Sequence, residues 1–180
     1  MIKPGDIGLS NKRKGWYPAA VRFFTRSKFS HVFIVGHEFY NELTVIEADL
    51  KVQVVPFKKE YIEKNADAYK IYRPKLASQK EIYKALAKTY QSAAGETYGF
   101  MQIPWFAVRS ILGKFGIKLS HNWFPIGQIC SETPVGYLKD LGQPYAVASI
   151  NLTPNETSPE DIAKIILARE DLFEFITERV

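Results

Sequence analysis

The apolar residues of this chain fall into short runs with the spacing expected of a sheet and several helices. Two β-branched-rich runs, 31–35 and 43–48, flank the polar stretch 38–42, a pattern typical of an antiparallel hairpin. Three further segments have the character of strands: 6–10, 52–57 and 69–72. The pattern therefore predicts an antiparallel sheet of four or five short strands.

Helix signals lie between and after these runs. Ser78 with Glu81 three residues later is the signature of a capping box, and it predicts a helix from 79 to about 94. Ser158 followed by Pro159 predicts the start of a helix that runs to 168. Helices are also expected at 18–24, 104–114 and 134–141, whereas 172–177 is ambiguous. Together these elements predict an α+β fold.

Composition bounds the possibilities further. The chain has 180 residues, of which 46% are apolar and 24% charged, with no repeat and no linker-like tract, so we expect a single domain over 1–180. Its one cysteine, Cys130, excludes an internal disulfide and any zinc site built on two or more thiolates. No apolar stretch follows Lys3, and no segment approaches the roughly eighteen apolar residues of a membrane span. We therefore expect no signal peptide, no transmembrane segment, and a location in the cytoplasm or in a larger particle acting at the cell envelope.

Charge is distributed unevenly along the chain. Residues 1–30 hold seven Lys and Arg against one acid, whereas residues 151–180 hold three against seven. A basic start with interleaved aromatic residues is compatible with nucleic acid or an anionic membrane as partner. A solvated helix face that complements the acidic end is the simpler interpretation, and we favour it over nucleic acid.

Three residues are candidates for chemistry. Cys130 lies near the start of a predicted helix, where unpaired backbone N–H groups and the helix dipole stabilise a thiolate. His31 begins one strand of the predicted hairpin, and Glu47 lies on the other. With a turn centred near Phe39, His31 faces Glu47 directly, with Cβ atoms about 5 Å apart. A carboxylate in that position would orient the imidazole.

Each candidate also has a simpler interpretation. A free cysteine is commonly buried and inert, and a histidine or glutamate on a strand is more often structural or solvated. His37, which shares the strand face of His31, and His121 are competing bases. A metal site built from His31, His37, Glu47 and Cys130 is conceivable, but no ligand-spacing motif supports it, so we predict no metal.

The order of these elements resembles that of a known family. The segments are Gly5-Asp6-Ile7-Gly8-Leu9-Ser10, Phe29-Ser30-His31-Val32-Phe33-Ile34-Val35, Val45-Ile46-Glu47-Ala48, Gly95-Glu96-Thr97-Tyr98-Gly99-Phe100 and Ile129-Cys130-Ser131-Glu132. In this order they resemble the circularly permuted branch of the NlpC-type papain-like cysteine peptidases, the YiiX/YebB-like group. The resemblance covers about residues 4 to 142 and implies a papain-like fold with the cysteine at a helix N-terminus. Residues 143–180 would then be a C-terminal elaboration.

The resemblance also implies roles for individual residues. Cys130 would be the nucleophile, His31 the general base and Glu47 the group that orients the imidazole, with no cofactor required. Tyr98 matches a tyrosine that lines the site in that family. The implied activity is that of a cysteine hydrolase (a thiol peptidase or amidase) that cleaves a peptide or N-acyl amide bond, as in peptidoglycan, through an acyl-enzyme.

The substrate is left open by these patterns. Cell-wall peptide and lipid-modified molecules are both compatible with the resemblance, since the related lecithin retinol acyltransferase group transfers or hydrolyses acyl chains. The aromatic run 100–124, with Trp105 and Trp123, forms either a substrate groove or core. The alternative from another class is a non-catalytic binding or assembly module on the same fold, such as a subunit of a phage or cell-wall particle.

Overall fold

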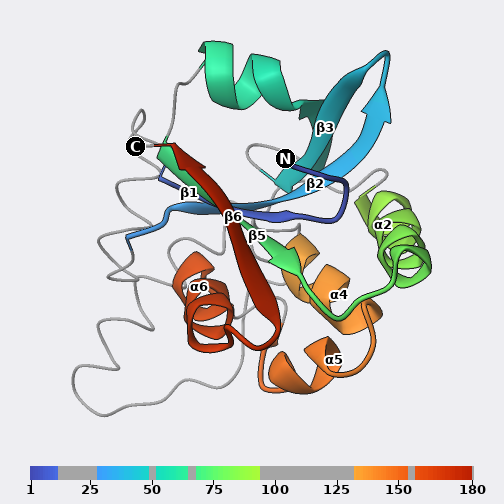
Figure 1. Ribbon diagram of the computed structural model, residues 1–180, viewed down its shortest axis with the longest axis vertical. Coiled ribbons are helices and arrows are strands. Elements are labelled where there is room, and N and C mark those ends of the chain that lie inside the picture. Colours follow the sequence, from blue (N-terminus) through green and yellow to red (C-terminus); the bar gives the residue numbers. More distant parts are fainter. Residues whose placement is uncertain (12–27, 49–51, 65–67, 94–131, 154–156, 180) are drawn as a thin grey trace, which may run out of the picture.

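The computed structural model of the chain describes residues 1–11, 28–48, 52–64, 68–93, 132–153 and 157–179. This part of the chain forms an α+β structure with one antiparallel sheet and helices on both faces (Figure 1). The helices expected at 18–24 and 104–114 lie outside the described residues. None of the described helices is long and apolar enough to cross a membrane.

The sheet has six strands rather than four or five. They are β1 (Ile7–Asn11), β2 (His31–Phe39), β3 (Glu42–Ala48), β4 (Val52–Pro56), β5 (Ala68–Pro74) and β6 (Phe173–Arg179). Their order across the sheet is β4-β3-β2-β1-β5-β6, and each neighbouring pair is antiparallel. The sixth strand comes from the ambiguous segment 172–177, because pairing with β5 gives its backbone hydrogen-bond partners.

Two of the described helices begin at the capping boxes that the sequence predicts. The described helices are η1 (Lys58–Lys64), a short helix with π-type hydrogen bonding, α2 (Gln79–Ala93), α4 (Glu132–Asp140), α5 (Tyr145–Ala148) and α6 (Pro159–Ala168). The backbone N–H of Ser78 donates to Oε2 of Glu81 at 2.8 Å, and the backbone N–H of Glu81 donates in return to Oγ of Ser78. Ser158 and Asp161 form the same reciprocal box at the start of α6. Both predicted caps are therefore confirmed.

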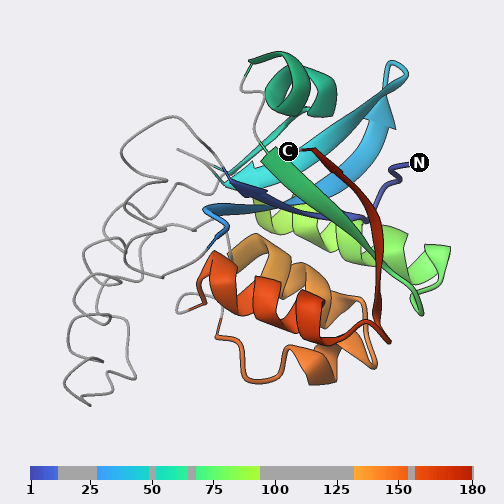
Figure 2. The ribbon, with the colours of Figure 1, turned by 60° about the vertical axis from the view of Figure 1, so that its left-hand side comes forward.

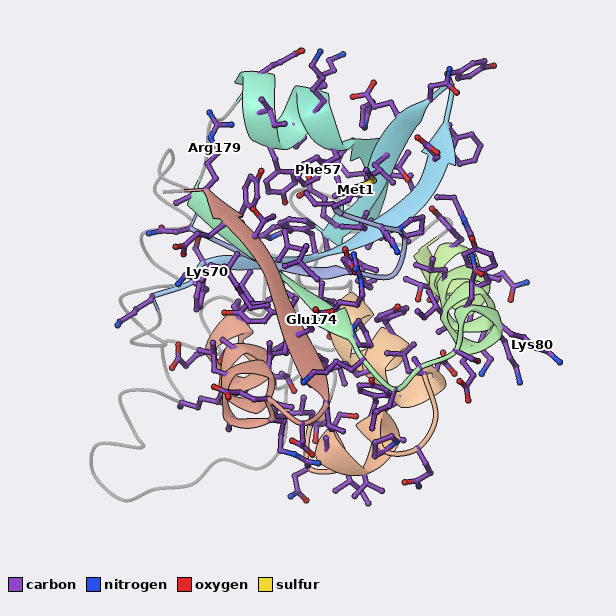
Figure 3. All side chains as sticks on the ribbon, viewed as in Figure 1. Met1, Phe57, Lys70, Lys80, Glu174 and Arg179 are labelled. Carbon is purple, nitrogen blue, oxygen red and sulfur yellow. The ribbon has the colours of Figure 1, made fainter. Side chains whose placement is uncertain are left out.

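The two faces of the sheet carry separate cores. Helices α2, α4 and α6 cover one face and η1 covers the other (Figure 2). Alternate residues of β2 divide between these cores: Val32 and Ile34 pack toward α4, whereas Phe33 and Val35 pack toward η1. Phe57 lies between η1 and the sheet, where its ring contacts those of Phe33, Tyr61 and Tyr69 (Figure 3). We call the face of the sheet that η1 covers the η1 face.

The N-terminal residues join three elements of the fold. Arg73 in β5 donates from Nε and Nη2 to the two carboxylate oxygens of Asp6, each at 2.8 Å. The buried hydroxyl of Tyr137 in α4 donates to the backbone carbonyl oxygen of Gly5 at 2.9 Å. Burial raises the pKa of Tyr137 far above its usual range, so this donor stays protonated. The Gly5-Asp6 opening thus ties β1 to β5 and fixes α4 against the sheet.

Candidate active site

His31 and Glu47 form a buried hydrogen-bonded pair on neighbouring strands. Nε2 of His31, the first residue of β2, lies 2.9 Å from Oε2 of Glu47 in β3. The two residues are only 2% and 1% exposed. A carboxylate in this position fixes the orientation of the ring and favours the form that carries hydrogen on Nε2. The sequence predicted this contact, although by a different register.

The hairpin turns later in the sequence than predicted. Its tip is formed by Tyr40 and Asn41, which have positive φ angles of 51° and 61°, instead of being centred at Phe39. Two successive residues with positive φ make a turn whose twist matches that of the flanking strands. Asparagine adopts this conformation readily, but a tyrosine gives little signal for it in a sequence. The prediction of a turn centred at Phe39 was therefore wrong.

A bulge in β2 reverses part of this displacement, because the pairing is three positions from the predicted register at Glu38 and only two at Val35. The register pairs Val35 with Val45 and shifts before Glu38. Continuing the pairing toward the start of β2 places His31 diagonally to Glu47, and the predicted direct opposition of these two residues was wrong. The total displacement is two residues, an even number, so both side chains remain on the same face of the sheet. Diagonal neighbours are within reach of a long side chain such as glutamate.

His37 does not share the strand face of His31, contrary to expectation. The bulge turns it toward α2, where its ring lies 4.9 Å from that of Tyr83 and 5.9 Å from that of Tyr90. Gly36 permits this close packing, since a Cβ there would lie 2.3 Å from the hydroxyl oxygen of Tyr90. The competing base is therefore on the opposite side of the sheet from Glu47.

Two further residues bind the Glu47 carboxylate. The hydroxyl of Tyr61 in η1 donates to Oε2 at 2.5 Å, and Nε2 of Gln53 in β4 donates to Oε1 at 3.1 Å. Because the carboxylate is buried, these donors replace the water that would otherwise solvate its charge. The Glu47 side chain is thus held in place whether or not His31 is protonated.

Sequence analysis missed both of these donors. The contact of Gln53 could have been predicted from the sequence. Gln53 is a polar residue in a valine-rich strand, and the pairing of β4 with β3 places it directly opposite Glu47. Tyr61 lies on η1, whose turns do not follow the spacing of an α-helix, so no periodicity pointed to it.

The geometry of the pair allows His31 to exchange protons through one of its ring nitrogens. Nε2 of His31 is bound by Glu47, whereas Nδ1 makes no hydrogen bond to any residue in the described part of the chain. An imidazole held at one nitrogen by a carboxylate can accept and release a proton at the other, and the carboxylate stabilises the imidazolium that forms. Nδ1 is therefore the atom through which His31 would exchange protons with a reacting group.

The remaining predicted site residues lie outside the described residues: Cys130, Tyr98, Trp105 and Trp123, and with them the competing base His121. The chain is described again from Glu132, two positions after Cys130, where α4 begins. This helix packs against β2, the strand that starts at His31. Pro134 lies in its first turn, as the sequence predicted.

The described side chains do not gather into a metal site. Within residues 1–11, 28–48, 52–64, 68–93, 132–153 and 157–179, no three His, Cys, Asp or Glu residues are placed to hold one ion. His31 and Glu47 bind each other through Nε2 and Oε2.

These features define a class of structure. It is an α+β fold with a six-stranded antiparallel sheet, helices on both faces and a buried histidine–carboxylate pair on a hairpin within the sheet. The chain is similar to the crystal structure of the metalloprotein YiiX from Escherichia coli O157:H7, with a TM-score of 0.62 and 19% sequence identity over 98% of this chain and 97% of that chain. The fold is thus YiiX-like, as in the group that the sequence resembles. No protein-family model matches the sequence, and no match was found among curated proteins.

Proposed function

We propose that this protein is a cysteine hydrolase that cleaves an amide bond, in a peptide or an N-acyl group, through an acyl-enzyme on Cys130. The observation that carries the proposal is the buried contact of His31 with Glu47, 2.9 Å between Nε2 and Oε2. That contact leaves Nδ1 for proton exchange and supplies a fixed negative charge beside the ring.

The position of Cys130 in the sequence supports its role as nucleophile. It is the only cysteine of the chain and precedes the first residue of α4 by two positions. The N-terminus of an α-helix lowers the pKa of a nearby thiol, because unpaired N–H groups and the helix dipole stabilise the thiolate. A neighbouring imidazolium adds to this effect.

In the proposed reaction the Cys130 thiolate attacks the amide carbonyl carbon. His31, protonated at Nδ1, gives its proton to the leaving nitrogen as the carbon–nitrogen bond breaks, and the acyl group remains on sulfur. The charge of Glu47 stabilises the imidazolium before that transfer. Water then releases the acid and restores the thiolate and the imidazolium.

YiiX from Escherichia coli O157:H7 is described as a metalloprotein. The described residues of this chain do not fit one, because His31 and Glu47 bind each other and no third donor joins them there. The two carboxylate oxygens of Glu47 also accept hydrogen bonds, Oε2 from Tyr61 and Oε1 from Gln53. We therefore derive no step through a metal ion.

The test uses p-nitrophenyl acetate as the acyl donor. We expect the wild-type protein to release nitrophenolate and to carry one acetyl group on Cys130, detected by mass spectrometry of the digested protein. Cys130→Ala and His31→Ala should each abolish the acetylation. His31→Gln, whose amide can still donate to Glu47, should be equally inactive because it cannot exchange a proton.

His37→Ala is the matched control, since His37 packs against α2 and has no place in the mechanism. Circular dichroism establishes that each variant is folded. Acetylation of Cys130 at the wild-type rate in folded His31→Gln would refute the proposal, and so would an equal loss in His37→Ala. A wild-type protein that never acquires an acetyl group would favour a non-catalytic module.

A further inference from the structure

Tyr61 and His31 bind the same oxygen atom of Glu47. The hydroxyl of Tyr61 donates to Oε2 at 2.5 Å, and Nε2 of His31 lies 2.9 Å from that atom. Tyr61 comes from η1, which covers the sheet, whereas His31 and Glu47 lie on neighbouring strands. Tyr61, His31 and Glu47 are 0%, 2% and 1% exposed. Bulk water is therefore largely excluded from the contacts of Oε2.

When this pair takes up a proton, the hydrogen between the two side chains has two positions open to it. It can lie on Nε2 of His31, which makes an imidazolium beside a carboxylate. It can also lie on Oε2 of Glu47, which makes a neutral imidazole beside a carboxylic acid. Burial favours the neutral form, because separated charges lose their solvation by water. The charged form therefore needs hydrogen-bond donors to the carboxylate.

Two described donors meet that need. Tyr61 donates to Oε2, the atom that would receive the proton, inside a buried cluster. Gln53 donates to the other oxygen, Oε1, at 3.1 Å and is itself partly exposed. Hydrogen bonds to a charged acceptor are stronger than those to a neutral one, so each donor favours the carboxylate over the carboxylic acid. The effect of Tyr61 is the larger one, because water can partly replace Gln53.

Other titratable or charged groups near Tyr61 come from three elements. Glu60 precedes Tyr61 in η1 and is buried. Tyr69 of β5 packs its ring against that of Tyr61, with centroids 6.3 Å apart, and burial raises its pKa, so that its hydroxyl stays neutral. Arg179 of β6 donates from Nη1 to the backbone carbonyl oxygen of Tyr61 at 3.3 Å. Glu60 and Arg179 carry opposite charges, whereas the hydroxyl of Tyr61 acts on Oε2 by direct contact.

We propose that Tyr61 is a positioning residue that keeps the shared proton on His31. Without its hydroxyl, the proton passes from Nε2 of the imidazolium to Oε2 of Glu47. The N–H bond breaks, an O–H bond forms, and the two opposite charges cancel. The catalytic consequence rests on the proposed function: a neutral ring is a weaker proton donor to the leaving nitrogen and stabilises a Cys130 thiolate less.

Nitrogen-15 NMR of histidine-labelled protein locates this proton without a catalytic assay. His31→Gln and His37→Ala assign the signals of His31 among the three histidines. At a pH where the wild-type ring is protonated, we expect a one-bond coupling to hydrogen at both nitrogens of His31. In Tyr61→Phe the ratio of the charged to the neutral pair should fall by about tenfold or more, because the carboxylate loses a hydrogen bond to a charged acceptor. The coupling at Nε2 is then lost and that at Nδ1 is kept.

Infrared spectroscopy reports the same proton from the side of Glu47. We expect a C=O stretching band of a protonated carboxylic acid in the difference between Tyr61→Phe and the double variant Tyr61→Phe/Glu47→Gln. The corresponding difference between wild type and Glu47→Gln at the same pH should show a carboxylate band instead.

Tyr69→Phe is the matched control. It removes a hydroxyl from the same aromatic cluster, and its ring still contacts those of Phe57 and Tyr61. His31 should keep hydrogen on both nitrogens as in wild type. Gln53→Met removes the other donor and leaves the packing of η1 untouched. It should lower the ratio of charged to neutral pair in the same direction as Tyr61→Phe, but by less.

Three results would overturn the inference: a folded Tyr61→Phe that keeps both hydrogens on His31 to the wild-type extent, an equal change in Tyr69→Phe, or a wild-type pair whose proton already lies on Glu47. The second would assign the effect to packing of the cluster. Failure of the proposed function is a separate result. A wild-type protein that never acquires an acetyl group on Cys130 would remove the hydrolase and leave the position of the proton as measured.

Discussion

Three side chains from three elements bind the carboxylate of Glu47. His31 comes from β2, Gln53 from β4 and Tyr61 from η1, with donor to acceptor distances of 2.9, 3.1 and 2.5 Å. Hydrogen bonds to a charged acceptor are among the stronger ones in proteins, and they are strengthened where water is excluded. Glu47 thereby links the candidate site to the packing of η1 on the sheet.

The hydroxyl of Tyr61 provides a test at this scale. We expect Tyr61→Phe to lower the free energy of unfolding by about 1 to 2 kcal/mol, because the buried carboxylate loses a donor while the ring still packs. Urea denaturation at unchanged m-value measures the difference.

Tyr40→Phe, at the fully exposed hairpin tip, is the control and should leave the free energy of unfolding unchanged. Equal effects of the two substitutions would contradict the assignment of Tyr61 as a stabilising partner of Glu47.

At the scale of elements, strong local signals made most of the described fold predictable. Short β-branched-rich runs located β1 to β5, and the capping boxes at Ser78 and Ser158 located the starts of α2 and α6. The features that escaped prediction depend on tertiary contacts. They are β6, defined by its pairing with β5, the bulge in β2, η1, and the one-turn helix α5.

The contact of His31 with Glu47 was predicted correctly even though the predicted register was wrong. Side chains alternate with period two, so the observed displacement by two residues changed the partner directly opposite without changing the face. A displacement by one residue would have separated the pair.

The capping box of α2 predicts a pH dependence. Hydrogen bonds from the side chain and backbone N–H of Ser78 lower the pKa of Glu81 below its usual range. Since the folded-state pKa is the lower one, the charged carboxylate contributes stability above the unfolded-state pKa, and this contribution is lost as the pH falls through the folded-state pKa. Glu81→Gln should therefore be less stable than wild type near neutral pH, with a difference that starts to shrink near the unfolded-state pKa of about 4.3 and is gone below the folded-state pKa.

Thermal melting between neutral and acidic pH measures this difference. Glu170→Gln, an exposed glutamate that follows α6, is the control and should melt with wild type throughout. A stability difference between wild type and Glu81→Gln that does not shrink as the pH falls below about 4.3 would contradict the role of the carboxylate charge.

At the scale of the whole molecule, the fold separates two layers that the proposed chemistry must join. His31 and Glu47 lie on the η1 face of the sheet, whereas α4, the helix that follows Cys130, packs on the other. His31 is the first residue of β2, so its side chain lies at the end of the sheet, where a segment can pass from one face to the other. Cys130 and His31 are 99 positions apart in the sequence, and no local pattern could predict their meeting.

The most direct measurement of the central claim is the rate of alkylation of Cys130 by iodoacetamide as a function of pH. The chain has one cysteine, so the reaction reports on that thiol alone. In the wild-type protein we expect an apparent thiol pKa well below the value of a free cysteine, about 8.5, and a return toward that value in folded His31→Gln. An ordinary thiol pKa in both proteins, or a Cys130 that resists alkylation across neutral pH, would contradict the account.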